Sequence, residues 1–319
     1  MPRYKVLLTD YAWPNLDIER KILAEGDAEL VVAPQGDVAT LSKLAADVDA
    51  IMTNWAKVPE AVIAASPKCR IVSRLGIGLD NIDVKYATER GIVVTNIPDY
   101  CLIEVAEHTL ALMLTLGRKT AFYHLETKAG RYALGAGPEL RRLEAQTLGI
   151  IGMGNIGRLV AAKAKAFGFR VLGTSRRQAP MPAGVEWREL DALVAESDYI
   201  SLHAPSTPET KHLMDAARLA RMKPTAYLIN TSRGALIDEA ALAAALEAGQ
   251  LAGAALDVQQ QEPPDLSRPP FNDPRVIVTP HAAFFSRESV TELRQRVAEQ
   301  VVKRLHGEIP ENVVNPGVL

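Results

Sequence analysis

Short apolar runs alternate with amphipathic stretches along the first hundred residues of the chain. Runs of four or five apolar residues are typical of buried strands, and apolar residues repeating every three or four positions are typical of helices. Strands are predicted at 5–8, 29–32, 50–53, 70–73 and 92–95. Helices are predicted at 15–24, 38–46, 59–64 and 84–90. This alternation predicts a parallel sheet with helices on both faces.

The same alternation returns after residue 147. Strands are predicted at 148–151, 170–174, 198–203, 226–229, 252–256 and 276–279. Helices are predicted at 158–167, 190–195, 215–220 and 238–248, with longer ones at 103–116 and 287–305. Residues 130–142 and 259–274 lack periodicity and are expected to be loops. Since 319 residues are enough for two cores, we predict an α/β protein with two parallel-sheet domains.

A glycine turn, G-M-G-N-I-G, occupies residues 152–157 between a predicted strand and a predicted helix. Gly152 would permit the tight turn, Gly154 the close approach of a pyrophosphate, and Gly157 the packing of helix on strand. Asn155 and Ile156 would begin the helix, whose free N–H groups and positive dipole end favour phosphate. Three glycines alone are a weak motif, but the strand–turn–helix–strand context predicts dinucleotide binding.

The residues after the second strand of this unit indicate which dinucleotide binds. An NAD site usually places Asp or Glu there for the ribose hydroxyls, whereas this chain has Ser175, Arg176 and Arg177. Guanidinium groups form bidentate hydrogen bonds with phosphate, which suits the 2′-phosphate of NADP. The alternative is a pair of solvated arginines at a strand end. We therefore favour NADP as the cofactor, with NAD possible.

Composition excludes several other classes of protein. The chain is 48% hydrophobic and 23% charged with a formal net charge of -2, which gives no electrostatic case for nucleic acid or an acidic membrane. Its two cysteines are too few for a disulfide framework and lack metal-site spacing. The N-terminus enters a strand at once, without the apolar core of a signal peptide. We expect a cytoplasmic enzyme with no metal.

Candidate chemical residues follow predicted strands of the second region. Arg233, Glu262 and His281 each come after a buried strand, so they are expected to meet at one sheet edge. An Arg can hold a carboxylate, a His can transfer a proton, and a Glu beside that His would orient it. In the first region, the glycine-containing loop 75–83 also follows a strand and could offer backbone N–H groups to an anion. For each of these residues taken singly, an ordinary structural role is the alternative.

Seven stretches of the chain contain motifs that together point to one family. They are L-G-I-G-L-D-N-I-D at 75–83, V-A-E-H-T-L-A-L-M-L at 105–114, G-M-G-N-I-G at 152–157, S-L-H-A-P-S-T-P-E-T at 201–210, L-I-N-T-S-R-G at 228–234, A-L-D-V-Q-Q-Q-E-P at 255–263 and T-P-H-A-A at 279–283. Taken together they resemble the D-isomer-specific 2-hydroxyacid dehydrogenase family, including its phosphoglycerate dehydrogenase-like and C-terminal-binding-protein-like members. They occur in the family's order and cover nearly the whole chain.

The resemblance implies a function for each motif. Arg233, Glu262 and His281 would be catalytic, and Gly76, Ile77 and Gly78 would contact the substrate carboxylate through the backbone. The remaining implied contacts are to the cofactor. Asp257 would contact the nicotinamide carboxamide, Thr231 and Ser232 would lie nearby, and His203 and Pro205 would contribute mainly backbone, His203 being expected to be structural.

The resemblance also implies the architecture and the reaction. It implies two Rossmann-like domains, one flavodoxin-like and one dinucleotide-binding, with a cleft between them. The substrate-binding domain would comprise 1–101 and 287–319, and the dinucleotide-binding domain 102–286. The implied activity is hydride transfer between NAD(P)H and a small 2-oxo or D-2-hydroxy acid such as glyoxylate or hydroxypyruvate, in a homodimer.

Departures from the family pattern leave alternatives open. The usual N-x-P-G turn is N-I-P-D at 96–99, followed by Tyr100 and Cys101, as in corepressor-like relatives that sense the cofactor. The arm at 130–142 lacks the tryptophan common in the family. A phosphite- or phosphoglycerate-type dehydrogenase and a cofactor-sensing interaction protein are therefore the alternatives to a 2-oxo acid reductase.

Overall fold

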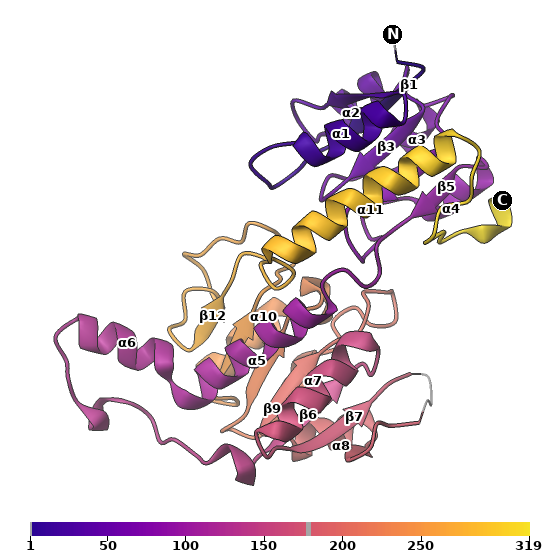
Figure 1. The fold of residues 1–319 in the computed structure, drawn as a ribbon. Coiled ribbons are helices and arrows are strands. Elements are labelled where there is room, and N and C mark those ends of the chain that lie inside the picture. The colour runs from indigo at the N-terminus through magenta and orange to yellow at the C-terminus, as the bar shows by residue number, and fades with distance from the viewer. Residues whose placement is uncertain (1, 177–179) are drawn as a thin grey trace. The chain divides into compact units, whose positions relative to one another are not determined.

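The chain divides into two compact units. The computed structural model describes residues 2–176 and 180–319 (Figure 1). Unit 1 comprises Met1–Tyr100 and Ser286–Leu319, and unit 2 comprises Cys101–Phe285. Each unit has its own parallel sheet, so the expectation of an α/β protein with two Rossmann-like domains is confirmed.

Unit 1 is built on five parallel strands in the order β2-β1-β3-β4-β5, which is the flavodoxin-like order. Most strand residues are buried, because helices cover both faces of the sheet. The strands are β1 (Tyr4–Leu8), β2 (Ala28–Val32), β3 (Ala50–Thr53), β4 (Ile71–Arg74) and β5 (Val93–Thr95). The helices are α1 (Asp17–Glu25), α2 (Val38–Ala45), α3 (Glu60–Ala64), α4 (Val84–Glu89) and α11 (Arg287–Leu305). Asp83 caps the start of α4, since its carboxylate accepts a hydrogen bond from Tyr86 N.

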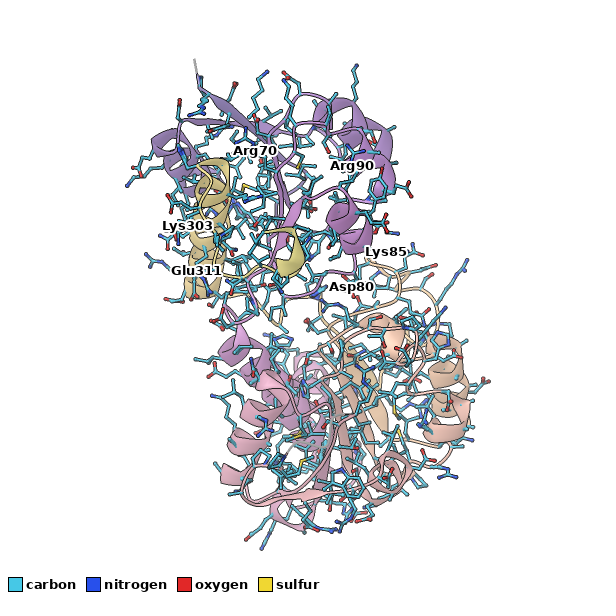
Figure 2. The ribbon with its side chains drawn as sticks, turned by 90° about the vertical axis from the view of Figure 1, so that its right-hand side faces the viewer. Arg70, Asp80, Lys85, Arg90, Lys303 and Glu311 are labelled. Atoms are coloured by element: carbon cyan, nitrogen blue, oxygen red, sulfur yellow. The ribbon has the colours of Figure 1, made fainter. Side chains whose placement is uncertain are left out.

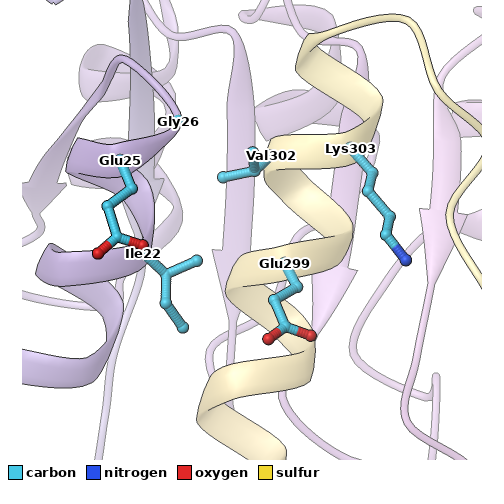
Figure 3. A pocket seen from close by; sticks show the side chains of 6 residues that line it. All are labelled: Ile22, Glu25, Gly26, Glu299, Val302 and Lys303. Atoms are coloured by element: carbon cyan, nitrogen blue, oxygen red, sulfur yellow. The ribbon is translucent and has the colours of Figure 1, made fainter.

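The last long helix, α11, returns to unit 1 and packs beside α1. Arg294 of α11 donates two hydrogen bonds of 2.7 Å to the Glu19 carboxylate of α1, and both side chains are buried. A side chain at Gly26 would lie 2.6 Å from a methyl group of Val302, so glycine is needed where the helices meet. Below this contact lies a hollow of about 270 Å³, into which Ile22 and Val302 point (Figure 3). None of the predicted site residues lines it.

The C-terminal tail is anchored to unit 1 by its side chains and backbone. Asn315 accepts a hydrogen bond from Val94 N and donates one to Ile92 O, and Val314 N donates to Val94 O. Lys303 at the end of α11 pairs with Glu311 at 3.4 Å (Figure 2). The tail thus lies along β5, and it ends in the 3₁₀ turn η4 (Pro316–Val318).

Unit 2 is built on seven parallel strands in the order β12-β11-β10-β9-β6-β7-β8. The sequence order reverses at β6, which lies between β7 and β9, so the topological switch point of a dinucleotide-binding sheet is there. The strands are β6 (Thr147–Ile151), β7 (Arg170–Thr174), β8 (Val185–Trp187), β9 (Tyr199–Leu202), β10 (Tyr227–Asn230), β11 (Gly253–Leu256) and β12 (Val276–Val278). The helices are α5 (Leu102–Arg118), α6 (Thr120–Lys128), α7 (Asn155–Ala166), α8 (Leu190–Glu196), α9 (Ala216–Leu219) and α10 (Glu239–Glu247), with 3₁₀ turns η1 (Leu134–Ala136), η2 (Leu143–Ala145) and η3 (Gly234–Leu236).

Two elements of unit 2 were not predicted. Helix α6 has no buried residue, so it has no apolar stripe that a periodicity could reveal. It is separated from α5 by Lys119, which has the left-handed φ of 55°. Strand β8 is only three residues long, and Val185 is its one buried member.

Candidate functional site

The glycine turn lies at the switch point of the unit 2 sheet. Gly152 has a φ of +104°, and a side chain there would collide with the backbone of His203, which follows β9. A side chain at Gly157 would collide with the carbonyl oxygen of Gly152. Both glycines are therefore required by the chain itself, and they bring the ends of β6 and β9 together.

Gly154 is different, because apart from its own neighbours in the chain no described residue lies within 4 Å of where its side chain would be. It is the N-cap of α7 in an extended conformation, and within the described residues no side chain caps the helix there. Asn155 is exposed, whereas the half-buried Ile156 packs on the core. The first N–H groups of α7 thus border open space, and this arrangement fits the pyrophosphate of a dinucleotide.

The residues proposed to determine the preference for NADP over NAD lie at the end of β7. Ser175 follows that strand, and the Arg176 guanidinium lies 3.9 Å from the carboxylate of Glu209 with its side chain 71% exposed. Arg158 connects the glycine turn to Pro180, because it donates hydrogen bonds to Met153 O at 3.0 Å and to Pro180 O at 3.1 Å. Arg177 lies outside the described residues.

Hydrogen bonds hold the segment after β10 that carries Arg233. The Asn230 side chain accepts from Ser232 N and donates to Arg233 O, and Ser232 Oγ donates to Ala204 O at 2.6 Å. Buried Thr231 bonds to Thr109 Oγ1 at 2.8 Å. The half-buried Arg233 guanidinium donates to Ser232 O at 2.7 Å. The loop that carries Arg233 is thus held to the segment after β9 through Ala204 and to α5 through Thr109.

Gly234 joins the Arg233 loop to the Glu262 loop. A side chain at Gly234 would collide with the backbone of Gln259 and Gln260. Gln259 N in turn donates a hydrogen bond of 3.0 Å to Glu262 Oε1. Close packing of these two loops therefore sets where Arg233 and Glu262 lie relative to each other.

Glu262 and His281 form a direct pair. The distance between His281 Nδ1 and Glu262 Oε2 is 2.8 Å, and the two side chains are 29% and 34% exposed. Burial opposes ionisation of Glu262, but hydrogen bonding and charge interaction with His281 outweigh it, and the pKa of Glu262 is lowered. The sequence expectation that these residues meet at one sheet edge agrees with this geometry.

His281 lies on a turn that Asp257 holds. The φ of His281 is 52°, a left-handed conformation that costs a non-glycine residue about 1–2 kcal/mol. His281 N donates to Asp257 O at 2.8 Å, while Ala282 N and Ala283 N donate to the Asp257 carboxylate at 2.8 and 2.9 Å. These hydrogen bonds keep the turn in its strained conformation.

The Asp257 carboxylate is fully buried and charged. Burial would raise its pKa, but hydrogen bonds from His108, Thr279, Ala282 and Ala283 outweigh this and lower the pKa of Asp257 to about 2. The side chain is 0% exposed. Its oxygens are thus engaged by the chain, and a contact with a nicotinamide carboxamide would require this carboxylate to become accessible.

His203 and Pro205 border the glycine turn. His203 Nε2 lies 2.8 Å from Ser201 Oγ, and burial lowers the pKa of His203 to about 4, so its ring is neutral at neutral pH. Pro205 is exposed and its carbonyl accepts a hydrogen bond from Thr210 Oγ1. The His203 backbone, rather than its ring, is what contacts the turn at Gly152.

In unit 1, the loop after β4 is held by its carbonyl groups. Gly76 O accepts from Ile97 N, Ile77 O from Asn96 Nδ2, and Gly78 O from Arg74 Nε. Gly76 has a φ of +155°, which favours glycine. All three carbonyl oxygens thus accept hydrogen bonds within unit 1, and these bonds hold the loop in place.

Sequence reasoning missed the residues that position the site. Arg74, His108, Gln259 and Thr279 carry hydrogen bonds to the loops of the site. Arg74 directly precedes the first motif stretch, and the other three lie inside motif stretches in which no function was assigned to them. A pattern of apolar and polar positions contains no signal for such contacts. Within residues 2–176 and 180–319, every helix is too short or too polar to span a bilayer, and no cluster of His, Cys, Asp and Glu could hold a metal ion.

Comparison with known proteins supports one family. Residues 110–283 match the family described as D-isomer specific 2-hydroxyacid dehydrogenase, NAD binding domain. The chain is 41% identical over 264 residues to a glyoxylate reductase of Korarchaeum cryptofilum, an alignment covering 81% of this chain and 80% of that protein. It is 38% identical over 316 residues to a D-3-phosphoglycerate dehydrogenase of Methanocaldococcus jannaschii, covering 98% of this chain but only 59% of that protein.

A solved structure agrees over the full length of the chain. The D-lactate dehydrogenase of Aquifex aeolicus, complexed with NAD and lactic acid, superposes with a TM-score of 0.88 at 29% identity. The match covers 98% of this chain and 99% of that one. The fold, the motifs and these similarities agree, and the chain belongs to the D-isomer specific 2-hydroxyacid dehydrogenase family.

Proposed function

We propose that the protein is a nicotinamide-dependent reductase of small 2-oxo acids such as glyoxylate or hydroxypyruvate, yielding D-2-hydroxy acids. The observation that carries this proposal is the 2.8 Å pair of His281 and Glu262, on the same sheet edge as a glycine turn with open space at Gly154. An acid–base pair beside a dinucleotide site is what carbonyl reduction requires.

His281 would act through Nε2. Because Glu262 is ionised, it accepts a hydrogen bond, and His281 Nδ1 therefore carries the hydrogen of that contact. The proton given to the substrate oxygen would then leave from Nε2. The negative charge of Glu262 would stabilise the imidazolium before the transfer and hold the ring in one orientation.

Arg233 and the loop of Gly76, Ile77 and Gly78 are the proposed carboxylate contacts. A guanidinium binds a carboxylate by paired, charge-assisted hydrogen bonds, and Arg233 could also polarise the substrate carbonyl. The loop would contribute backbone N–H groups, since its carbonyls are occupied within unit 1. Thr231 and Ser232 would support the cofactor side of the same strand end.

The proposed cofactor is NADP, with NAD possible. When bound, a reduced nicotinamide would supply the hydride for the carbonyl carbon. Ser175 and Arg176 would bind the 2′-phosphate, and no Asp or Glu follows β7 to bind ribose hydroxyls instead. Arg176 lies 3.9 Å from Glu209, and it would have to exchange this contact for one with the phosphate.

A panel assay at 340 nm tests this function. Purified protein should oxidise NADPH with glyoxylate or hydroxypyruvate, and its KM for NADPH should be at least about tenfold below that for NADH, because one phosphate–guanidinium contact stabilises binding by more than about 1.4 kcal/mol. The R176A variant should lose that difference, while R268A, on an exposed loop, should keep it. Equal use of NADH would contradict the cofactor proposal alone.

The same panel distinguishes the alternative substrates. It should include phosphite and 3-phosphoglycerate with the oxidised cofactor, because the same three residues could serve those reactions. The similarity to a phosphoglycerate dehydrogenase makes that substrate the second candidate. If cofactor binds but none of these compounds turns over, a cofactor-sensing interaction protein becomes the better account.

We further propose that the enzyme is a cytoplasmic homodimer. Both cysteines are buried and free, which fits a reducing compartment. The arm after α6 exposes two large apolar side chains, with Tyr132 92% and Leu134 90% accessible, and Leu125 of α6 itself is 66% accessible. Exposed apolar surface of this kind is typical of an association site, and a second copy is the occupant we propose.

A further inference from the structure

Three side chains lie together beneath the turn that carries His281. They are His108 of α5, Thr279 after β12, and Asp257 after β11, all in unit 2. Thr279 Oγ1 lies 2.5 Å from Asp257 Oδ1, and His108 Nε2 lies 3.2 Å from Thr279 Oγ1 and 3.5 Å from Asp257 Oδ1. Neither His108 nor Thr279 belongs to the proposed catalytic, substrate-binding or cofactor-binding residues.

The chemistry of these groups fixes the direction of each hydrogen bond. The Asp257 carboxylate is ionised, so it can only accept, and the Thr279 hydroxyl hydrogen is donated to it. The Thr279 oxygen is therefore an acceptor toward His108. It follows that His108 Nε2 carries a hydrogen, and that a chain of donors runs from His108 through Thr279 to Asp257.

This series of hydrogen bonds ends at Asp257, whose groups set the conformation of His281. The same carboxylate accepts from Ala282 N and Ala283 N, and the carbonyl of Asp257 accepts from His281 N. If the carboxylate rotated, the left-handed turn would lose two of these anchors. Thr279 and His108 oppose that rotation, because both hold Oδ1.

We propose that His108 is a positioning residue for His281, acting through Thr279 and Asp257. The role of His281 in proton transfer rests on the proposed function, but the mechanical coupling does not. His108 is 25% exposed and touches Thr279 from α5, so it ties the turn to the longest helix of unit 2. Its task is to keep the imidazole of His281 aimed, rather than to exchange protons with substrate.

Amide hydrogen exchange tests the coupling without any substrate or cofactor. In T279V and H108L, exchange at the amides of residues 281–283 should become at least tenfold faster, while amides of α7 stay unchanged. H108Q should keep slow exchange, since its side-chain amide can still donate to Thr279. H124L, which changes an exposed histidine of α6, is the matched control. T279S, which keeps the hydroxyl group, should also keep slow exchange, and H108L alone carries the test should T279V fail to fold.

Kinetics then separate positioning from a general structural role. We expect T279V and H108L to lower kcat by tenfold or more with little change in substrate KM, and H108Q and T279S to recover most of the rate. Unchanged exchange at 281–283 in both T279V and H108L would overturn the proposal. Equal loss in H108Q and H108L would also overturn it. If exchange responds as expected but no 2-oxo acid is reduced, the proposed function fails and the coupling stands.

Discussion

At the scale of single residues, the glycine turn shows that similar residues can be required for different reasons. Gly152 and Gly157 lack side chains because the chain itself occupies that space. Gly154 lacks one although no described residue other than its chain neighbours lies within 4 Å of the space a side chain would take. The sequence motif predicts all three positions, but only the packing separates a requirement of the fold from a requirement of a ligand.

This difference gives a prediction for three alanine substitutions. G154A should change the free energy of unfolding by less than about 1 kcal/mol, since the added methyl meets nothing, yet weaken dinucleotide binding at least tenfold. G157A should destabilise the fold by about 2 kcal/mol or more, because the methyl collides with backbone. G135A, where space is also open, is the control. Denaturant titration and fluorescence binding of NADPH measure both; tight binding by G154A would show that no phosphate fills the space.

Motif residues could be predicted from sequence because each follows a strand, and strand ends of a parallel sheet meet at one edge. The pairing of Glu262 with His281 was expected on that basis. The left-handed φ of His281, the clamp of Asp257 and the contact of His108 could not be predicted, because they depend on side-chain directions after the loops have packed. The apolar pattern reports burial, so it predicted the buried strands. It missed α6 because that helix buries no residue.

At the scale of elements, many hydrogen bonds constrain the turn at 279–283 of unit 2. Its amides, its threonine and a histidine from α5 all converge on one buried carboxylate. A buried charge is tolerated only where hydrogen bonds compensate its lost hydration. The turn and Asp257 therefore stabilise each other.

The lowered pKa of Asp257 predicts a pH dependence of stability. Its pKa is about 2 in the folded protein and near 3.8 when unfolded, so ionisation favours folding above pH 4 and this contribution is lost as the pH falls through 2. The stability difference between wild type and D257N should be constant from pH 7 to pH 5 and fall by about 1 kcal/mol by pH 3. Urea unfolding at each pH measures it. A difference independent of pH down to 3 would show that the carboxylate is not held as described.

At the scale of the whole molecule, the proposed site residues are distributed over two units whose parallel sheets differ in strand order. The glycine turn and the Glu262–His281 pair belong to unit 2, whereas the proposed carboxylate loop at 76–78 belongs to unit 1, which α11 completes. The arm around Tyr132 and Leu134 leaves apolar side chains exposed on a single chain.

Association through this arm is a further prediction. Light scattering should give wild-type protein at micromolar concentration a mass twice the 34.6 kDa of one chain. The double variant Y132D/L134D should approach the mass of one chain, because charged groups are not buried without partners. L266D, which alters an exposed leucine outside the arm, should remain dimeric. A monomeric wild type, or an unaffected double variant, would contradict the proposed interface.

The central claim is that His281 gives the proton in reduction of a 2-oxo acid, and a single comparison tests it most directly. Wild type and H281A should be measured side by side for turnover of glyoxylate and hydroxypyruvate with NADPH and for equilibrium binding of NADPH. We predict that H281A lowers kcat by about a hundredfold to ten-thousandfold, as expected for loss of a general acid, while the Kd for NADPH stays within about threefold. Turnover by H281A equal to that of wild type would contradict the account.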